Sequence, residues 1–224
     1  PRVEEICDNK IRESYDIYNG IDIVTANNDC VLAGSKSGQI FSWDISSHKR
    51  MTPSSATSIS SVDRRSEKLR YINIRSIAFD PTGTMFACSE KRGTFESIIR
   101  FFSYTDGEWR ELEELEEQRL DCEQYSLLFK RRSTIELVSA GQDGKLRSWT
   151  VGRSGKWEVS EHETSFCDVS MTSIAFFPKE DNLLCGMSNL DSHYNRDYVR
   201  KFTHDLSDKK DSAFLQIFYS GSNQ

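Results

Sequence analysis

The chain has 224 residues, a formal net charge of −6 and 37% hydrophobic residues, enough for one large domain or two small ones. No apolar run approaches the roughly 18 residues of a membrane-spanning helix, and the opening residues PRVEEICDNK lack the apolar segment of a signal peptide. We therefore expect an intracellular protein, cytoplasmic or nuclear, without a membrane partner. The acidic balance disfavours direct binding of nucleic acid, which requires clustered Lys and Arg.

The six cysteines are widely spaced, and none belongs to a C-x-x-C pair, so the sequence lacks the ligand spacing of a zinc site. We expect reduced thiols, mostly buried in strands, rather than metal ligands or disulfides. The positions are Cys7, Cys30, Cys88, Cys122, Cys167 and Cys185.

The first predicted strand, Ile11–Tyr18 (IRESYDIY), lies ahead of a set of repeats, and residues 1–20 are assigned to a neighbouring or closing blade. The repeat occurs four times, with starts about 50 residues apart. A fixed period of this length indicates a repeat architecture. The four copies are Ile21–Ile45, Ile74–Tyr104, Gln124–Val151 and Thr172–His204.

The first repeat contains the strands IDIV, VLAGS and IFSWD. It is followed by Ser46–Arg70, a basic segment rich in Ser and Thr, in which a fourth strand is expected at Ala56–Val62.

The second repeat opens with IRSIAF, and Asp80–Gly83 then predicts a type I turn, with Pro at its second position and Gly at its fourth. An inserted loop is expected at Glu90–Ser97. The Asp-Gly dipeptide at 106–107 predicts a hairpin into the fourth strand. The acidic segment Glu111–Glu123 is expected to form a short helix with its leucines inward.

The third repeat carries the strongest local signal, LVSAGQDGKLRSWTV. Asp143-Gly144 between two apolar runs indicates a tight hairpin, because Gly144 tolerates a positive φ and Asp143 can hydrogen-bond the turn backbone. A hairpin at Ser154-Gly155 leads into a fourth strand near Trp157.

The fourth repeat contains the strands TSIAFF, LLCGM and VRKFT. An inserted loop is expected at Ser188–Asp197, and a further strand at Ala213–Tyr219 is predicted to complete this repeat.

The stacked repeats contain columns of similar residues that predict how the strands pack. Aligning VLAGS, MFACS, LVSAG and LLCGM gives two adjacent columns of small residues, which indicates close approach of neighbouring sheets. The first of these columns holds Ala33, Ala87, Ser139 and Cys185. Each third strand carries a large aromatic ring, followed by a short polar residue, that is suited to filling the gap between sheets.

Four strands per repeat form the blade of a β-propeller, and the repeats resemble WD40 repeats from about Ile21 to His204. The dipeptide at 43–44 is the Trp-Asp of the family name, and residues 141–144 match its inter-strand turn. No Gly-His dipeptide occurs, so the family's Asp–His–Ser–Trp hydrogen-bond network is incomplete in every repeat. The resemblance implies these structural blade positions: Trp43, Asp44, Phe102, Asp143, Gly144, Trp149 and Phe202.

Within the family, the segment IRSIAFDPTGTMFACSEKRGTFESIIRFFSY and the later SAGQDGKLRSWT are similar to the WD-repeat subunits of superkiller RNA-decay complexes. The resemblance implies an all-β WD40-type propeller with blades at about 21–70, 71–123, 124–171 and 172–220. Because the commoner propellers need roughly 300 residues, we expect a partial propeller of about four four-stranded blades, completed by another segment or chain. A closed four-bladed ring is the alternative.

No catalytic, cofactor-binding or metal-ligating pattern is found: GSKSG lacks the central Ser of a nucleophile elbow, and no H-E-x-x-H occurs. We expect a non-enzymatic scaffold, a WD-repeat subunit of a multiprotein complex whose partners are other protein subunits. The alternative is an RNA- or DNA-associated adaptor that uses the basic segment 46–70. The inserted loops are expected on one face, and the candidate partner-binding residues are Arg64, Arg65, Lys91, Arg92, His193, Tyr194 and Arg196.

Overall fold

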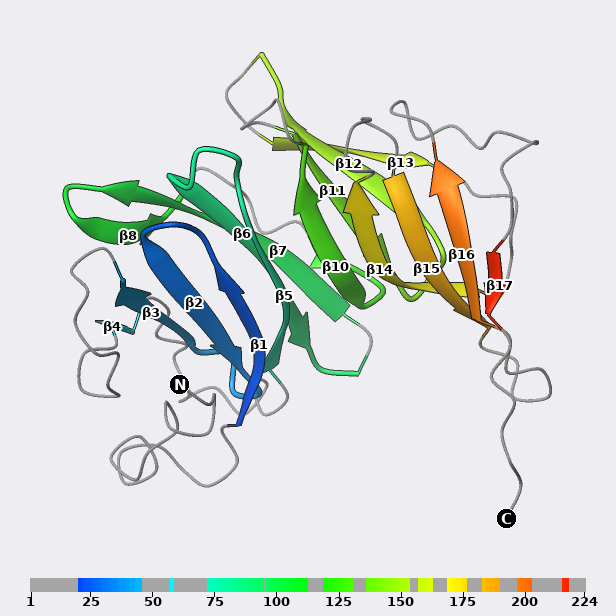
Figure 1. Cartoon of the computed structure of the whole chain (residues 1–224), viewed down its shortest axis with the longest axis horizontal. Coiled ribbons are helices and arrows are strands. Elements are labelled where there is room, and N and C mark those ends of the chain that lie inside the picture. Colours follow the sequence, from blue (N-terminus) through cyan, green and yellow to red (C-terminus); the bar gives the residue numbers. More distant parts are fainter. Residues whose placement is uncertain are drawn as a thin grey trace. The chain divides into compact units, whose positions relative to one another are not determined.

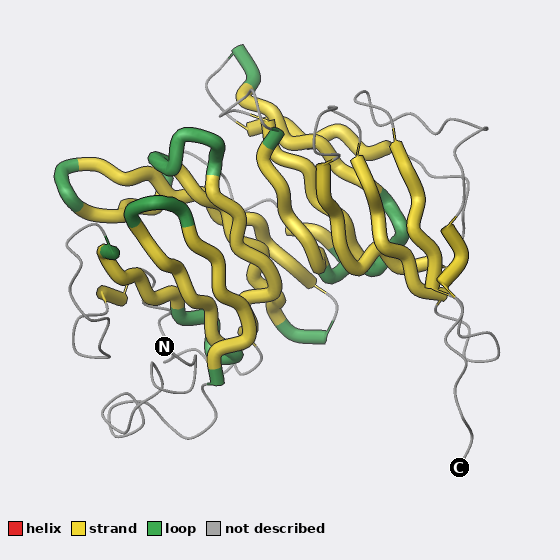
Figure 2. The backbone as a smooth tube through the Cα atoms, viewed as in Figure 1, coloured by secondary structure: helices red, strands yellow, loops and turns green. Residues whose placement is uncertain are grey.

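Every regular element that the structure describes is a β-strand (Figures 1 and 2). The structure is a computed structural model, and the all-β class predicted from the sequence is confirmed. The residues described are 20–45, 57–58, 72–94, 96–112, 119–130, 136–153, 157–162, 169–176, 183–189, 197–202 and 215–217.

The chain divides into two compact units, Pro1–Asp121 and Cys122–Gln224, and each contains two antiparallel sheets. In the first unit, the first sheet has the order β1 to β4 and the second sheet the order β5 to β8, with β9 pairing to β7. The strands are β1 (Ile21–Ala26), β2 (Cys30–Ser35), β3 (Ile40–Asp44), β4 (Thr57–Ser58), β5 (Ile72–Phe79), β6 (Met85–Arg92), β7 (Glu96–Thr105), β8 (Glu108–Glu111) and β9 (Arg119–Leu120).

The second unit repeats this arrangement, with the third sheet in the order β10 to β13 and the fourth in the order β14 to β17. Each sheet is thus a meander in which consecutive strands pair, as expected for propeller blades. The strands are β10 (Gln124–Phe129), β11 (Glu136–Gly141), β12 (Leu146–Val151), β13 (Trp157–His162), β14 (Val169–Phe176), β15 (Leu183–Asn189), β16 (Asp197–Phe202) and β17 (Leu215–Ile217).

The first unit has a core between its two sheets. Leu32 and Ile40 of the first sheet pack with Ile74, Phe86 and other buried residues of the second. The sheets approach closely at residue 34: a Cβ added to this glycine would lie 2.5 Å from Cγ2 of Ile74. The small residue predicted at this point is therefore required by the close contact between sheets.

The core of the second unit joins the third and fourth sheets in the same way. Val138 and Leu146 pack against Met171, Leu183 and Cys185, and all five side chains are buried. Apolar residues at every second position of each strand place one face of the strand in this core.

Cysteines in both units serve as packing residues. Cys30, Cys88, Cys122 and Cys185 are free thiols, and the last three are buried. Burial raises the pKa of the Cys88 thiol far above its ordinary value and that of Cys122 to about 11. Cys88 and Cys185 lie in the hydrophobic cores of the two units, which is consistent with a packing role.

The second sheet differs from the sequence prediction in two places. The loop expected at Glu90–Ser97 is mostly strand, because β6 runs to Arg92 and β7 begins at Glu96. The helix expected at Glu111–Glu123 is also wrong for the residues described at its ends: Glu111 closes β8, and Arg119–Leu120 is strand β9.

The strand register corrects the predicted column of small residues in the second repeat. The third-strand rings at 43, 102 and 149 pair across the sheet with Val31, Phe86 and Leu137. Counting from these pairs, Cys88 and not Ala87 is equivalent to Ala33. The stack of Phe86 on Phe102 fixes this one-residue difference.

Short segments of the fourth strands expected in the first and fourth repeats are described, and both are strands. Thr57–Ser58 pairs with β3 inside the range Ala56–Val62, and Leu215–Ile217 pairs with β16 inside Ala213–Tyr219. The strand expected at Ile11–Tyr18 lies outside the described residues.

Candidate functional site

The aromatic column of the third strands is buried wherever its side chains are described. Trp43, Phe102 and Trp149 each have 1% of their surface exposed. Phe102 stacks on Phe86, with ring centroids 4.6 Å apart and planes 10° from parallel. Phe202 lies in β16, where the structure describes the strand and not the side chains.

The predicted turn of the third sheet has the local geometry that its sequence requires. Gly144 has a φ of 70°, and its N–H donates to the carbonyl of Gly141 at 3.2 Å. The N–H of Lys145 donates to Oδ1 of Asp143 at 3.3 Å. In the first sheet, Asp44 closes β3 and is exposed.

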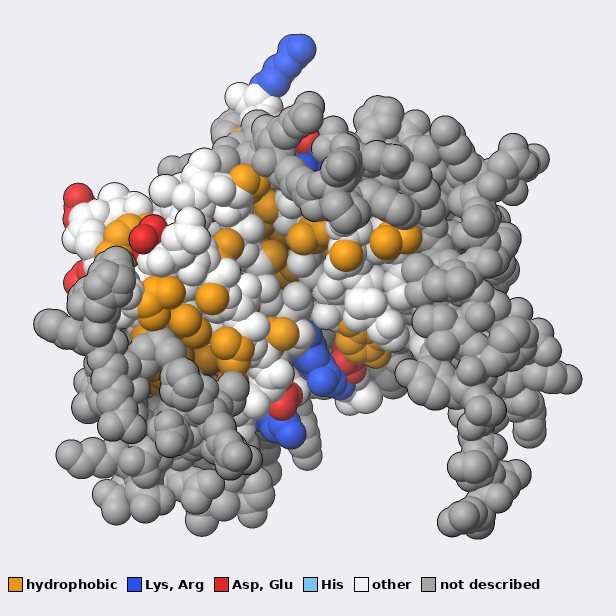
Figure 3. Space-filling model, viewed as in Figure 1, with side chains coloured by type: hydrophobic (Ala, Val, Ile, Leu, Met, Phe, Trp, Pro, Cys, Tyr) orange, Lys and Arg blue, Asp and Glu red, His pale blue; other side chains and the backbone are white. Residues whose placement is uncertain are grey.

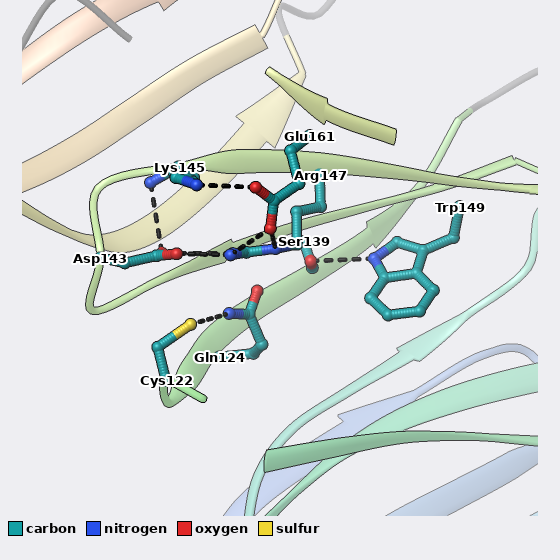
Figure 4. A network of polar contacts seen from close by, with 8 residues as sticks. All are labelled: Cys122, Gln124, Ser139, Asp143, Lys145, Arg147, Trp149 and Glu161. Atoms are coloured by element: carbon teal, nitrogen blue, oxygen red, sulfur yellow. Dashed lines mark hydrogen bonds and ion pairs between the residues drawn. The ribbon is translucent and has the colours of Figure 1, made fainter. Parts of the chain in front are cut away.

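Trp149 makes a buried hydrogen bond to a serine of the neighbouring strand. Its Nε1–H donates to Oγ of Ser139 at 2.9 Å, and both residues are buried (Figure 4). A buried indole N–H requires such an acceptor, because leaving a polar group unpaired in the interior is costly.

Replacement of Trp149 by Phe is expected to lower the free energy of unfolding by about 2 kcal/mol, since it leaves the Ser139 hydroxyl without this donor and removes buried ring surface. In the Ser139→Ala background the same replacement is expected to cost less, because both polar partners are then absent. Denaturant unfolding of the four proteins measures the coupling. Additive losses would show that the hydrogen bond contributes nothing.

Asp143 is held by an arginine instead of a histidine. The side chain of Arg147 is 4% exposed and lies between Asp143 and Glu161 (Figure 4). Its Nη1 donates to Oδ1 of Asp143 at 3.2 Å and its Nε to Oε1 of Glu161 at 2.9 Å. Lys145 pairs with the other oxygen of Glu161 at 2.7 Å. We call these four residues the third-sheet ion network.

The two carboxylates of this network are stabilised in their ionised form. Burial alone would raise the pKa of Asp143, but hydrogen bonds and attraction from Arg147 outweigh it and the pKa is lowered. The hydrogen bond from Lys145 lowers the pKa of Glu161, and Arg147 adds to this effect. Both acids are therefore charged at neutral pH and unsuited to donate a proton there.

The second sheet contains an equivalent arrangement around Arg100. Glu90, at 0% side-chain exposure, accepts from Nη1 of Arg100 at 2.9 Å and from Nε of Arg92 at 2.6 Å. Nε of Arg100 also donates to Oε1 of Glu111 on β8 at 2.7 Å. We call Glu90, Arg92, Arg100 and Glu111 the second-sheet ion network.

The two ion networks share a position that sequence reasoning missed. Arg100 and Arg147 both stand two residues before the ring of the aromatic column, and each binds an acid of the fourth strand. The repeated pattern Arg-x-aromatic was the available signal: it occurs at 100–102, 147–149 and 200–202.

The candidate partner-binding residues are mostly outside the described part of the chain. Of those described, Lys91 and Arg92 lie at the end of β6, paired across the hairpin with Ser97 and Glu96. Arg92 is 21% exposed and bound to Glu90. Those that lie outside the described residues are Arg64, Arg65, His193, Tyr194 and Arg196.

Two features are absent from the described residues. They contain no helix long and apolar enough to cross a membrane. They also contain no cluster of His, Cys, Asp and Glu arranged to hold a metal ion.

No protein-family model matches the chain, and no curated protein matches it in sequence. Similar solved structures include the β-propeller domain of Cps50 (Swd1) from Myceliophteria thermophila, at 12% identity and a TM-score of 0.53. Sqt1 from Chaetomium thermophilum has 16% identity and a TM-score of 0.56. Hydrazine synthase of Kuenenia stuttgartiensis has 11% identity and a TM-score of 0.64.

These matches cover 82%, 82% and 90% of this chain, respectively. This chain in turn spans 65% of the Cps50 structure, 44% of Sqt1 and 51% of the hydrazine synthase chain. At such low identities the likeness shows the fold alone. Together with the four meander sheets, it shows that the chain has a β-propeller fold.

Proposed function

We propose that this chain is a WD40-type propeller subunit that acts as a non-catalytic scaffold in an intracellular multiprotein complex. One observation carries the proposal: the polar hairpin β6–β7 is held rigid by a buried carboxylate. Glu90 is fully buried and binds both Arg92 and Arg100, so the strands stay paired up to the turn. A surface fixed in this way loses little conformational entropy when a partner binds.

The charges of the third-sheet ion network also support a structural role. A catalytic acid or base needs a pKa near the working pH, whereas the pKa values of Asp143 and Glu161 are lowered. Arg147 forms ion pairs with both carboxylates, so each of them lies beside an opposite charge. The networks stabilise the hairpins and fourth strands that carry them.

The cited solved structures are longer than this chain, which supports a propeller completed by a further segment or another chain. The four blades proposed at about 21–70, 71–123, 124–171 and 172–220 would form part of it. The similarity to superkiller WD-repeat subunits makes an RNA-decay complex one specific assembly to test, with the chain as protein scaffold.

Affinity purification of the tagged chain, followed by cross-linking and mass spectrometry, tests the proposal. We expect protein subunits in stoichiometric amounts, reduced by the substitution Lys91→Glu on the hairpin β6–β7. Lys130→Glu, in the other unit, is the matched control and should leave the complex intact. A chain that elutes without protein partners would contradict the scaffold function.

An adaptor that binds RNA or DNA through segment 46–70 is the other candidate, and the same preparation tests it. RNA or DNA that stays bound at about 0.15 M salt, and is lost when the basic residues of 46–70 are replaced, would favour it. Nucleic acid that dissociates at this ionic strength would exclude it.

A further inference from the structure

The end of the first unit opposite the hairpin β6–β7 carries an exposed aromatic pair. Tyr104 is 52% exposed, the most exposed large hydrophobic side chain among the described residues. Its ring lies on Trp109, with centroids 5.0 Å apart. Trp109 in turn contacts Phe86 at 4.8 Å and Phe79 at 6.0 Å. Tyr104 is therefore supported from beneath by a packed aromatic cluster and open on its outer side.

Three turns from both sheets meet at this end and hold it in place. Nδ2 of Asn27, in the β1–β2 turn, donates to the carbonyl of Gly83 in the β5–β6 turn at 3.4 Å. The N–H of Tyr104 donates to the carbonyl of Thr84 at 2.8 Å. Trp109 and Cys30 of the first sheet pack against the same core between the two sheets. The surface is thus tied to two sheets and needs little ordering before it binds.

Carboxylates surround the aromatic pair. Asp106 and Glu108 flank the turn of the hairpin β7–β8. In the first sheet, Asp29 precedes Cys30 in the sequence, and Asp44 of β3 pairs with Cys30 of β2. All four are exposed. Figure 3 shows acidic side chains bordering hydrophobic ones over this hairpin, at the left of the view.

Arg110 neutralises the carboxylates of the hairpin β7–β8 only in part. Arg110 approaches Asp106 at 3.7 Å, and the two side chains are 56% and 76% exposed. An ion pair so open to water contributes little. Among the described residues, Asp29, Asp106 and Glu108 outnumber this one guanidinium, which leaves the aromatic centre bordered by negative charge.

From this arrangement we propose that the Tyr104–Trp109 surface binds an arginine- or lysine-containing segment of a protein partner. The aliphatic stem of such a side chain would pack on the exposed ring, and its cationic head would lie over the ring face or beside the carboxylates. The carboxylates would repel nucleic acid phosphates. This inference rests on the proposed scaffold function and names the chemistry of one partner.

Fluorescence anisotropy of the full chain with a labelled peptide tests this inference. The probe is a fluorescein-labelled heptapeptide with arginines separated by alanines, and the same peptide with glutamine for arginine is its control. We expect saturable binding of the arginine peptide only, weakened by salt. Tyr104→Ala should weaken binding by about fivefold, and Glu108→Lys by a similar factor.

Val24→Ala is the matched control, because Val24 is 44% exposed on β1 of the same unit. It should change the affinity by less than about twofold, since isolated exposed apolar residues rarely contribute to binding. Equal unfolding midpoints of the variants would exclude loss of the fold as a cause. Equal weakening by Val24→Ala, or no saturable binding to the wild-type chain, would overturn the inference.

Peptide binding and co-purification together distinguish failure of this binding surface from failure of the scaffold function. If Tyr104→Ala weakens peptide binding while the purified complex keeps all its subunits, the scaffold function stands and its partners use another face. If the peptide binds through Tyr104 and no protein partner co-purifies, the surface stands and the scaffold function fails.

Discussion

Truncation of Phe102 to alanine is expected to lower the free energy of unfolding of the first unit by about 4 kcal/mol, the usual cost of removing a fully buried ring. Phe102 is 1% exposed and stacked on Phe86, and the guanidinium of Arg100 lies 5.2 Å from its centroid. The substitution leaves a cavity between the two sheets of this unit and removes the ring on which Arg100 rests. Both losses act in the same direction.

Phe102→Leu is the matched comparison, because leucine keeps most of the buried volume and should cost less than about 1.5 kcal/mol. Urea unfolding followed by tryptophan fluorescence measures both changes, since Trp109 packs in the same cluster. A loss below about 1 kcal/mol for the alanine variant would show that the aromatic column does not hold the sheets together.

The strands and their aromatic column could be predicted because both depend on local chemistry. Alternating apolar residues and turns such as Asp143-Gly144 are encoded within a few neighbouring positions. The rings at 43, 102 and 149 lie in third strands of similar pattern, and each of them is buried.

The register of β6 could not be predicted from the same kind of pattern. MFACS contains three small residues in a row, so it aligns with VLAGS equally well at two positions one residue apart. The stack of Phe86 on Phe102 decides between them, and that contact joins residues on different strands. Alternation with a period of two makes such a shift move every side chain to the other face.

The ion networks were missed for a similar reason. Glu90 is polar and precedes Lys91-Arg92-Gly93, which favours a loop when the sequence is considered alone. Burial of the Glu90 carboxylate is tolerated only because Arg92 and Arg100 both pair with it. Arg100 lies on the opposite strand, β7. Charges that are matched across strands leave no periodic signal in either strand.

Replacement of Arg147 by methionine is the second substitution with a large expected effect. It should lower the free energy of unfolding of the second unit by about 3 kcal/mol at neutral pH. Methionine matches the length of the buried stem, so the loss reports mainly the hydrogen bonds to Asp143 and Glu161. Lys145→Met is the matched control: this side chain is 38% exposed and also pairs with Glu161, and exposed pairs contribute about 0.5 kcal/mol.

The decrease in unfolding free energy caused by Arg147→Met should depend on pH in a defined direction. The pKa values of Asp143 and Glu161 are lowered in the folded chain. A lowered carboxyl pKa stabilises the fold fully above the unfolded value and ceases to do so as the pH falls through the folded value. With unfolded values of about 3.9 and 4.3, the full difference between wild type and Arg147→Met should persist above about pH 5 and shrink below about pH 4.

Urea unfolding at a series of pH values measures this difference directly, with Lys145→Met as a second reference. A difference that stays constant from neutral to strongly acidic pH would mean that Arg147 acts through packing of its stem alone. If instead the difference vanishes as the carboxylates take up protons, charge matching by Arg147 fixes the turn of the third sheet.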